Sequence, residues 1–201
     1  MTEITQGSPE WLRLRAGKVT ASKMSDVMAK GQGVTREKYK CKLAAERLTG
    51  KPIEGDFTTP AMKRGTELES EARELYSFQN DVDVIEVAIV PHQSIANALC
   101  SPDGLVGDGL IEIKCPDLST HVGYLLERKI PRNYQLQMLW QMACTGRQYC
   151  DWVSYCPDLP PRQRLLVIRF MRDEDQISAL EKAVIQFDME VEDLVNKLRN
   201  L

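Results

Sequence analysis

Apolar residues recur at intervals of three and four along the last part of the chain, which is the spacing of one face of an α-helix. The pattern covers residues 173–201 and is carried by Ile177, Leu180, Val184, Phe187, Val191, Leu194 and Leu198. It predicts a long amphipathic helix whose apolar stripe packs in the core or against another subunit. Start and stop signals predict shorter helices over residues 8–17, 35–49, 59–78, 118–127 and 131–144, and one more that opens at residues 20–22.

Five shorter stretches are rich in Val, Ile and other strand-forming residues, at residues 83–90, 98–101, 110–114, 149–155 and 165–170. Their order among the helices predicts an α/β fold with a mixed central sheet flanked by helices. A chain of 201 residues is most simply one domain with a sizeable core. It shows no internal repeat, low-complexity stretch or linker.

Composition narrows the class of protein. No apolar run approaches the length of a membrane span and no signal peptide opens the chain, so we expect no membrane contact and a cytoplasmic location. No C-x-x-C pair and no histidine at zinc spacing accompany the six cysteines, which are Cys41, Cys100, Cys115, Cys144, Cys150 and Cys156. We therefore expect reduced, mostly buried thiols and no zinc or iron–sulfur site.

The net charge of −3 hides an uneven distribution. Residues 1–64 hold 13 Lys/Arg against 7 Asp/Glu, whereas residues 65–201 hold 13 against 22. A basic N-terminal portion could line a surface that faces nucleic acid, while the acidic remainder faces solvent and supplies metal-binding carboxylates. Alternatively, Lys38, Lys40 and Lys42 are simply the solvated face of a helix.

The stretch Ser101–Pro116 carries the clearest chemistry. Its Gly-rich turn can fold the chain into a hairpin that brings Asp103 alongside Glu112, and Lys114 lies two residues further along the same strand face. Two carboxylates suit Mg²⁺, which prefers hard oxygen ligands, and the backbone carbonyl of Ile113 could add a third oxygen. A lysine beside them could orient the attacking water and stabilise negative charge, so the grouping indicates metal-assisted phosphodiester hydrolysis with one or two metal ions.

The same residues also have an ordinary structural interpretation. Asp108-Gly109 is a common turn former in its own right. Glu112 and Lys114 could be the solvated face of a half-buried strand, and an acidic residue at a free distance from a Glu-x-Lys occurs easily by chance. The hairpin alone therefore leaves both interpretations open.

Three further segments add to the evidence from the hairpin. The hairpin residues 101–105 and 112–116 resemble the PD-(D/E)xK nuclease motif in its lambda-exonuclease, YqaJ-type viral recombinase form. Residues 11–22 are similar to that family's opening W-x-x-x-R-x-G-x-x-T-A-S, residues 64–73 to its helix G-x-x-x-E-x-x-A-R, and residues 134–140 to its Q-x-Q helix. These segments occur in the family's order and span residues 11–140.

The resemblance implies a PD-(D/E)xK core and a Mg²⁺-dependent exonuclease, with Mn²⁺ as a substitute, that digests linear double-stranded DNA from its 5′ ends and leaves 3′ single-stranded tails. It also implies a toroidal homotrimer, a single-strand annealing protein as partner in phage recombination, and a phage or prophage gene expressed in a bacterial host. The residues that it assigns are the metal ligands Asp103, Glu112 and the Ile113 carbonyl, the catalytic Lys114 and Glu69, the 5′-phosphate ligands Arg15 and Ser22, Gln135 near the active site, and Met62 as a wedge between the terminal bases.

The assignment of the 5′-phosphate ligands is supported by the residues themselves, whereas the assignment of Glu69 is not. If a helix opens at Thr20–Ser22, its N-terminus is an anion site, and the Arg15 guanidinium can bind the same phosphate; simple helix capping is the alternative for Ser22. Glu69 has no such support. Glu67 and Glu71 lie four residues apart on one face of the same predicted helix and Glu69 lies on another, and all three could face solvent. Its choice rests on the resemblance.

Two other functions remain open at this point. The same core could serve a structure-specific or restriction-type endonuclease, which would cut a covalently closed circle. The chain could also be a DNA-binding recombination adaptor without activity, although it carries Asp103, Glu112, Lys114 and Glu69 together.

Overall fold

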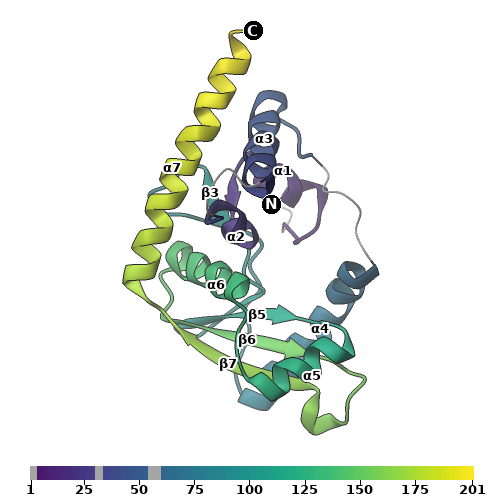
Figure 1. The fold of residues 1–201 in the computed structure, drawn as a ribbon. Helices are drawn as coiled ribbons and strands as arrows, with labels where there is room; N and C mark the ends of the chain where they lie inside the picture. Colours follow the sequence, from purple (N-terminus) through teal and green to yellow (C-terminus); the bar gives the residue numbers. More distant parts are fainter. Residues whose placement is uncertain (1–3, 30–33, 54–59) are drawn as a thin grey trace.

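The computed structural model describes residues 4–29, 34–53 and 60–201, and the side chains of all of these except residues 60–62. Figure 1 shows two small sheets, with the long helix α7 running along one side of the molecule. The helices are α1 (Pro9–Arg15), η1 (Ala21–Lys23), α2 (Met24–Val27), α3 (Val34–Thr49), α4 (Pro60–Asn80), α5 (Leu118–Glu127), α6 (Arg132–Thr145), η2 (Pro161–Gln163) and α7 (Glu174–Arg199). The strands are β1 (Val19–Thr20), β2 (Val90–Pro91), β3 (Ala98–Cys100), β4 (Gly104–Val106), β5 (Gly109–Lys114), β6 (Tyr149–Tyr155) and β7 (Leu165–Met171).

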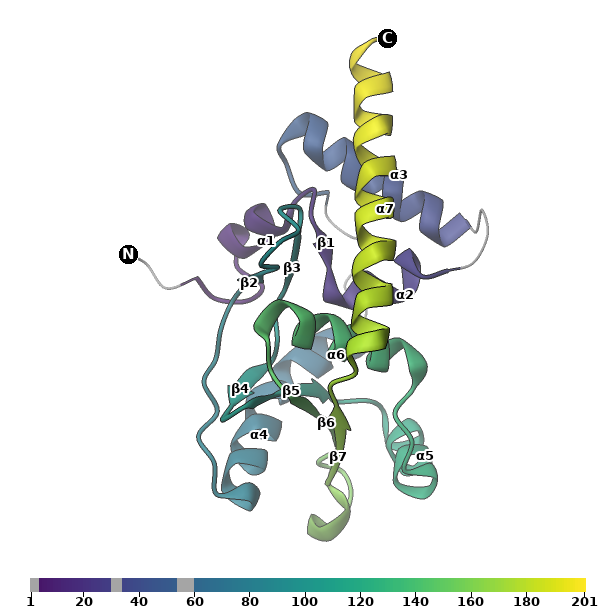
Figure 2. The ribbon, with the colours of Figure 1, turned by 90° about the vertical axis from the view of Figure 1, so that its left-hand side faces the viewer.

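The larger sheet has the order β4-β5-β6-β7. β5 runs parallel to β6 and antiparallel to β4, and β7 runs antiparallel to β6, so the sheet is mixed. In Figure 2, α6 and α4 lie on opposite faces of this sheet. Because side chains alternate along a strand, β5 directs Leu110 into the core around α6 and Ile111 and Ile113 into the smaller core beneath α4. Glu112 therefore lies on the same face as Leu110, toward α6.

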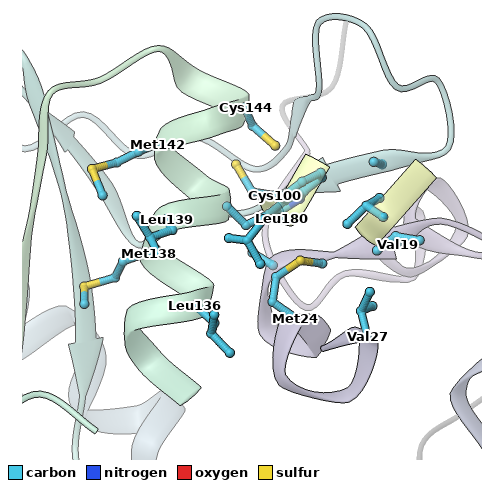
Figure 3. Close-up of a cluster of buried hydrophobic side chains, with 14 of the residues drawn as sticks. Val19, Met24, Val27, Cys100, Leu136, Met138, Leu139, Met142, Cys144 and Leu180 are labelled. Atoms are coloured by element: carbon cyan, nitrogen blue, oxygen red, sulfur yellow. The ribbon is translucent and has the colours of Figure 1, made fainter. Parts of the chain in front are cut away.

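The helix α6 is buried on both sides because it is enclosed between the two sheets. Figure 3 shows Met138 and Met142 pointing away from Leu136 and Cys144, which lie on the side of Cys100. The smaller sheet, of order β1-β3-β2, covers this second side. Beyond its exposed first turn the helix has no solvated stripe and little amphipathic character, and its polar residue Gln141 is fully buried.

Side-chain caps explain where several helices begin. Ser8 caps α1 by accepting a hydrogen bond from Trp11 N at 3.2 Å, Asp117 caps α5, and Asp173 caps α7. The helix α1 ends before Gly17, whose φ of +72° an L side chain rarely adopts and whose added Cβ would lie 2.8 Å from Arg47 Cγ. The N-terminal segment therefore folds back tightly against α3.

The expected α/β class, with mixed sheets flanked by helices, is confirmed, and one strand prediction was wrong. Residues 83–90 form no continuous strand, only an isolated bridge between Ile85 and Leu105 and then the short β2. Its alternation is imperfect and Ile85 is 63 % exposed, so the segment has no buried face to fix a register. A helical segment does open around Thr20–Ser22, as predicted, but it is short: the two-residue β1 leads into a 3₁₀ turn and the four-residue α2.

Two expectations from composition can be compared with the structure. All six cysteines are free, and four of them are buried. Within the described part of the chain, no helix is both long enough and apolar enough to cross a membrane.

Candidate active site

The β4–β5 hairpin brings together the residues that the sequence singled out. Gly104 pairs with Ile111, which places Asp103 opposite Glu112. Asp103 Oδ2 accepts a hydrogen bond from the backbone N–H of Ile113 at 2.6 Å, and the Lys114 ammonium donates to Glu112 Oε1. The two carboxylates, the ammonium and the backbone at Ile113 thus meet at one end of the sheet.

Two glutamines of α6 hold the other side of Glu112, which is 0 % exposed. Gln137 Nε2 donates to Glu112 Oε1 and Gln141 Nε2 donates to Glu112 Oε2, each at 2.6 Å. Gln135 lies elsewhere: its amide donates to the Ile130 carbonyl and accepts from Arg132. The glutamines that contact the site are therefore Gln137 and Gln141. Their spacing of four residues, which puts both on one face of a helix, is the signal that could have identified them.

Glu69 reaches the same site from α4. Arg73, one turn further along the helix, donates to Glu69 Oε1 at 2.7 Å and to the Asp103 carbonyl at 2.9 Å, so it ties α4 to the hairpin. The two neighbouring glutamates point elsewhere, since Glu67 pairs with Lys63 and Glu71 accepts a hydrogen bond from the Tyr155 hydroxyl. Among these three carboxylates, Glu69 is the one that lines the cleft beside Lys114.

Burial and mutual repulsion perturb these ionisable groups. Burial raises the pKa of Asp103 well above its usual range, and the negative charge of Glu112 adds to the effect. Burial also raises the pKa of Glu69, against the opposing charges of Arg73 and Lys114. Burial by itself would lower the pKa of Lys114, but the negative charges of Glu112 and Asp103 outweigh it and raise that pKa, so the lysine remains protonated.

The cleft at this end of the sheet has a volume of about 640 Å³ and is lined by Glu69, Ile113, Lys114, Arg64 and Tyr134, among others. A divalent cation fits its chemistry, because Asp103 and Glu112 offer hard oxygen donors whose repulsion a cation would relieve. No group of three or more His, Cys, Asp or Glu side chains in the described residues forms a ready-made metal centre. A metal ion would therefore also depend on the Ile113 carbonyl, water and substrate oxygens, as is usual for Mg²⁺.

A second, smaller cavity of about 180 Å³ lies beside α1 and is lined by both Arg15 and Ser22, together with Lys18, Lys23 and Lys42. The guanidinium of Arg15 stacks on Trp11 at 4.0 Å and donates to Ser101 Oγ at 3.0 Å. Partial burial lowers the pKa of Arg15 from its ordinary value.

This cavity is connected to the active site through the chain. Ser101 precedes Asp103 by two residues, so the Arg15–Ser101 hydrogen bond joins the basic cavity to the hairpin. Ser22 lies in a 3₁₀ turn rather than at the start of a long helix, so a helix dipole contributes little and the positive charge comes from the side chains. Met62 lies in the first turn of α4, and its side chain is outside the described residues.

Comparisons with known proteins agree with this arrangement. The family model of the YqaJ-like viral recombinase domain matches residues 10–148. The crystal structure of an alkaline exonuclease (LHK-Exo) from Laribacter hongkongensis is 43 % identical, with a TM-score of 0.90 over 96 % of this chain and 97 % of that one. The same exonuclease in complex with dAMP matches with the same values.

A more distant structure shares the fold alone. A phage-related exonuclease from Haemophilus somnus 129PT is 15 % identical, with a TM-score of 0.74 over 90 % of this chain and 96 % of that one. No curated protein matches the chain. The family model covers the hairpin, the α4 carboxylate, the α6 glutamines and the basic cavity, and the chain therefore belongs to the family of YqaJ-like viral recombinase domains.

Proposed function

We propose that this protein is a Mg²⁺-dependent exonuclease that digests one strand of linear double-stranded DNA from its 5′ end and leaves a 3′ single-stranded tail for recombination by strand annealing. The observation that carries the proposal is the meeting of Asp103, Glu112 and Lys114 in one hairpin beside the cleft that Lys114 and Glu69 line, joined by the Arg15–Ser101 hydrogen bond to a basic cavity. The 43 % identity to an alkaline exonuclease over nearly the whole chain supports the same reaction class.

In this proposal Asp103, Glu112 and the Ile113 carbonyl hold Mg²⁺, which when bound neutralises phosphate charge and lowers the pKa of water. Lys114 orients the attacking water and stabilises the negative charge that develops on the phosphate. Glu69, held by Arg73, also lines the cleft, where a raised pKa suits a group that accepts and releases a proton.

The direction of digestion follows from the basic cavity. A terminal 5′-phosphate is a dianion, and Arg15 and Ser22 offer a guanidinium and a hydroxyl to it among three lysines. Arg15 is already oriented by its stacking on Trp11, so little side-chain freedom is lost on binding. A 5′-phosphate bound in the cavity would lie near Ser101, two residues before Asp103. The cleft would then receive a phosphodiester bond near the 5′ end of the strand.

The wider setting is part of the proposal. We infer that the protein acts as a homotrimer in the cytoplasm of a bacterial host, that a single-strand annealing protein takes over the 3′ tail, and that Met62 separates the terminal bases. Mn²⁺ would replace Mg²⁺, and one or two ions would be bound. Sedimentation of the purified protein measures the trimer directly, and a monomer at micromolar concentration would contradict it.

The central experiment is a paired digestion with and without Mg²⁺. Linear duplex with 5′-phosphates is incubated beside a covalently closed plasmid of the same sequence. We expect loss of the linear DNA only, release of mononucleotides and no reaction in EDTA. Cutting of the closed circle would instead indicate the endonuclease alternative, and binding of linear DNA without hydrolysis would indicate the inactive adaptor.

A further inference from the structure

The carboxylate of Glu112 has unequal contacts at its two oxygens. Oε1 accepts hydrogen bonds from both Lys114 Nζ and Gln137 Nε2. Among the described residues, Oε2 accepts one hydrogen bond, from Gln141 Nε2. Each carboxylate oxygen has two lone pairs. Oε1 is therefore saturated by protein donors, and Oε2 keeps one lone pair for another partner.

The contact of Gln141 with this second oxygen costs the glutamine a hydrogen bond of its own. Its side chain is 0 % exposed, and its own Oε1 atom is buried without a hydrogen-bond partner in the described structure. Turning the amide over would bring that oxygen against the Glu112 carboxylate, which repels it. The observed orientation thus serves the Glu112 carboxylate rather than the glutamine itself.

The surroundings of Gln141 make its role distinct from that of Gln137. Both glutamines point from α6 to the same carboxylate, but Gln137 shares Oε1 with Lys114, whose own contact with that oxygen persists if Gln137 is lost. Gln141 has no such companion at Oε2 within the described residues. Its neighbour Met142 is equally buried in α6 and belongs to the hydrophobic core.

We propose that Gln141 is a positioning residue that fixes Glu112 with Oε2 as the oxygen available to a divalent cation. The inference rests on the proposed function, because it concerns the metal ion of that reaction. Residues that orient a metal ligand through a hydrogen bond commonly contribute about 10- to 100-fold to metal affinity or activity.

The test compares Gln141→Met, which keeps the length of the side chain and removes the donor, with Met142→Ala as the matched control. Met142→Ala removes buried volume from the same helix but no hydrogen-bond donor of Glu112, so its expected effect is on stability alone. Binding of Mn²⁺ to each folded protein is measured by calorimetry in the absence of DNA, and the Mg²⁺ concentration for half-maximal digestion of linear duplex is measured separately. We expect Gln141→Met to bind Mn²⁺ at least about 10-fold more weakly and to need correspondingly more Mg²⁺, while Met142→Ala matches the wild type in both.

Unchanged Mn²⁺ affinity in Gln141→Met would overturn the inference, and so would an equal loss of affinity in Met142→Ala, which would show an effect of stability only. If Gln141→Met does not fold, Gln141→Asn keeps the amide but is one methylene too short to reach Glu112, and the same weakening is expected. The wild type separates this inference from the proposed function: a wild-type protein that neither binds Mn²⁺ nor digests linear duplex refutes the function itself. A wild type that does both, beside a Gln141→Met protein that binds equally well, refutes the role of Gln141 alone.

Discussion

Replacing Lys114 with methionine tests how the cluster of charges in the cleft is balanced. The Lys114 side chain is 27 % exposed and its ammonium contacts Glu112, which is 0 % exposed. Asp103 and Glu69 are close enough for their charges to act on both residues. Lys114→Met keeps an apolar stem of similar length but leaves three carboxylates without the ammonium between them.

The size of the effect can be worked out from these contacts. Removing one partner of a buried ion pair costs roughly 3–5 kcal/mol, because the remaining charge is left uncompensated. Glu112 keeps its hydrogen bonds from Gln137 and Gln141, so we take the lower end, about 3 kcal/mol. For a chain of this size each 1 kcal/mol shifts Tm by about 2–4 °C, so Tm in EDTA should fall by about 6–12 °C.

Mg²⁺ should restore part of this loss, because a bound cation supplies the positive charge that the variant lacks. Thermal unfolding followed by circular dichroism, first in EDTA and then in excess Mg²⁺, should show a larger Mg²⁺-induced rise in Tm for Lys114→Met than for the wild type. Digestion of linear duplex should fall by about 100- to 1,000-fold, since a charge aimed at the reacting phosphate is gone. Binding of duplex ends should remain largely intact.

Lys63→Met is the matched control, because Lys63 also pairs with a glutamate but its side chain is 74 % exposed. An exposed ion pair contributes little to stability, so the free energy of unfolding of Lys63→Met should stay within about 0.5 kcal/mol of the wild type, and its Tm within about 2 °C. Lys114→Met with a wild-type Tm in EDTA and a wild-type response to Mg²⁺ would refute the charge-balance reasoning. A wild-type rate of digestion would refute the catalytic role of Lys114.

Three further predictions concern the basic cavity and the metal. Arg15→Ala should erase the preference for a 5′-phosphate over a 5′-hydroxyl end, measured as the ratio of initial rates on the two duplexes; a ratio equal to that of the wild type would refute the phosphate assignment. Glu46→Ala should lower the free energy of unfolding by about 2 kcal/mol in urea, because it leaves the buried N–H of Gly17 and the partly buried N–H of Ile53 without their acceptor; no change would show that water satisfies them. EDTA should abolish digestion and Mg²⁺ should restore it, and activity that persists in EDTA would exclude the metal-dependent mechanism.

The sequence predicts the structure correctly wherever the local pattern and the tertiary contacts favour the same conformation. The three-and-four spacing of Ile177, Leu180 and Val184 predicts α7, and each of these residues is buried in its apolar face. The hairpin is equally local, since the two-residue turn at Gly107 and Asp108 pairs Val106 with Gly109, and this register places Asp103 opposite Glu112. Its geometry could therefore be predicted before any long-range contact was known.

The sequence does not predict the structure correctly where contacts with distant segments determine the local conformation. The Val- and Ile-rich residues 83–90 have the composition of a strand, but the neighbouring β4 offers them a single bridge, so the ladder does not form. Ser22 is similar: the preceding residues pair with β3, and this pairing holds them extended and confines the following helical turn to a few residues. In both cases the tertiary partner overrides a local preference.

The choice among the glutamines of α6 shows the same limit at the site itself. On an amphipathic helix the polar face is the solvated one, and a glutamine there needs no further explanation. The helix α6 is enclosed on both sides, so its sequence contains no solvated stripe from which to judge where Gln135, Gln137 and Gln141 point. Gln135 lies in the first turn and bonds the loop before it, whereas Gln137 and Gln141 lie four residues apart among buried apolar neighbours. Gln141 is buried and Gln137 is partly buried, and an amide removed from water needs a hydrogen-bond partner. Two such amides on one face of an enclosed helix indicate a polar group opposite, which here is the carboxylate of Glu112.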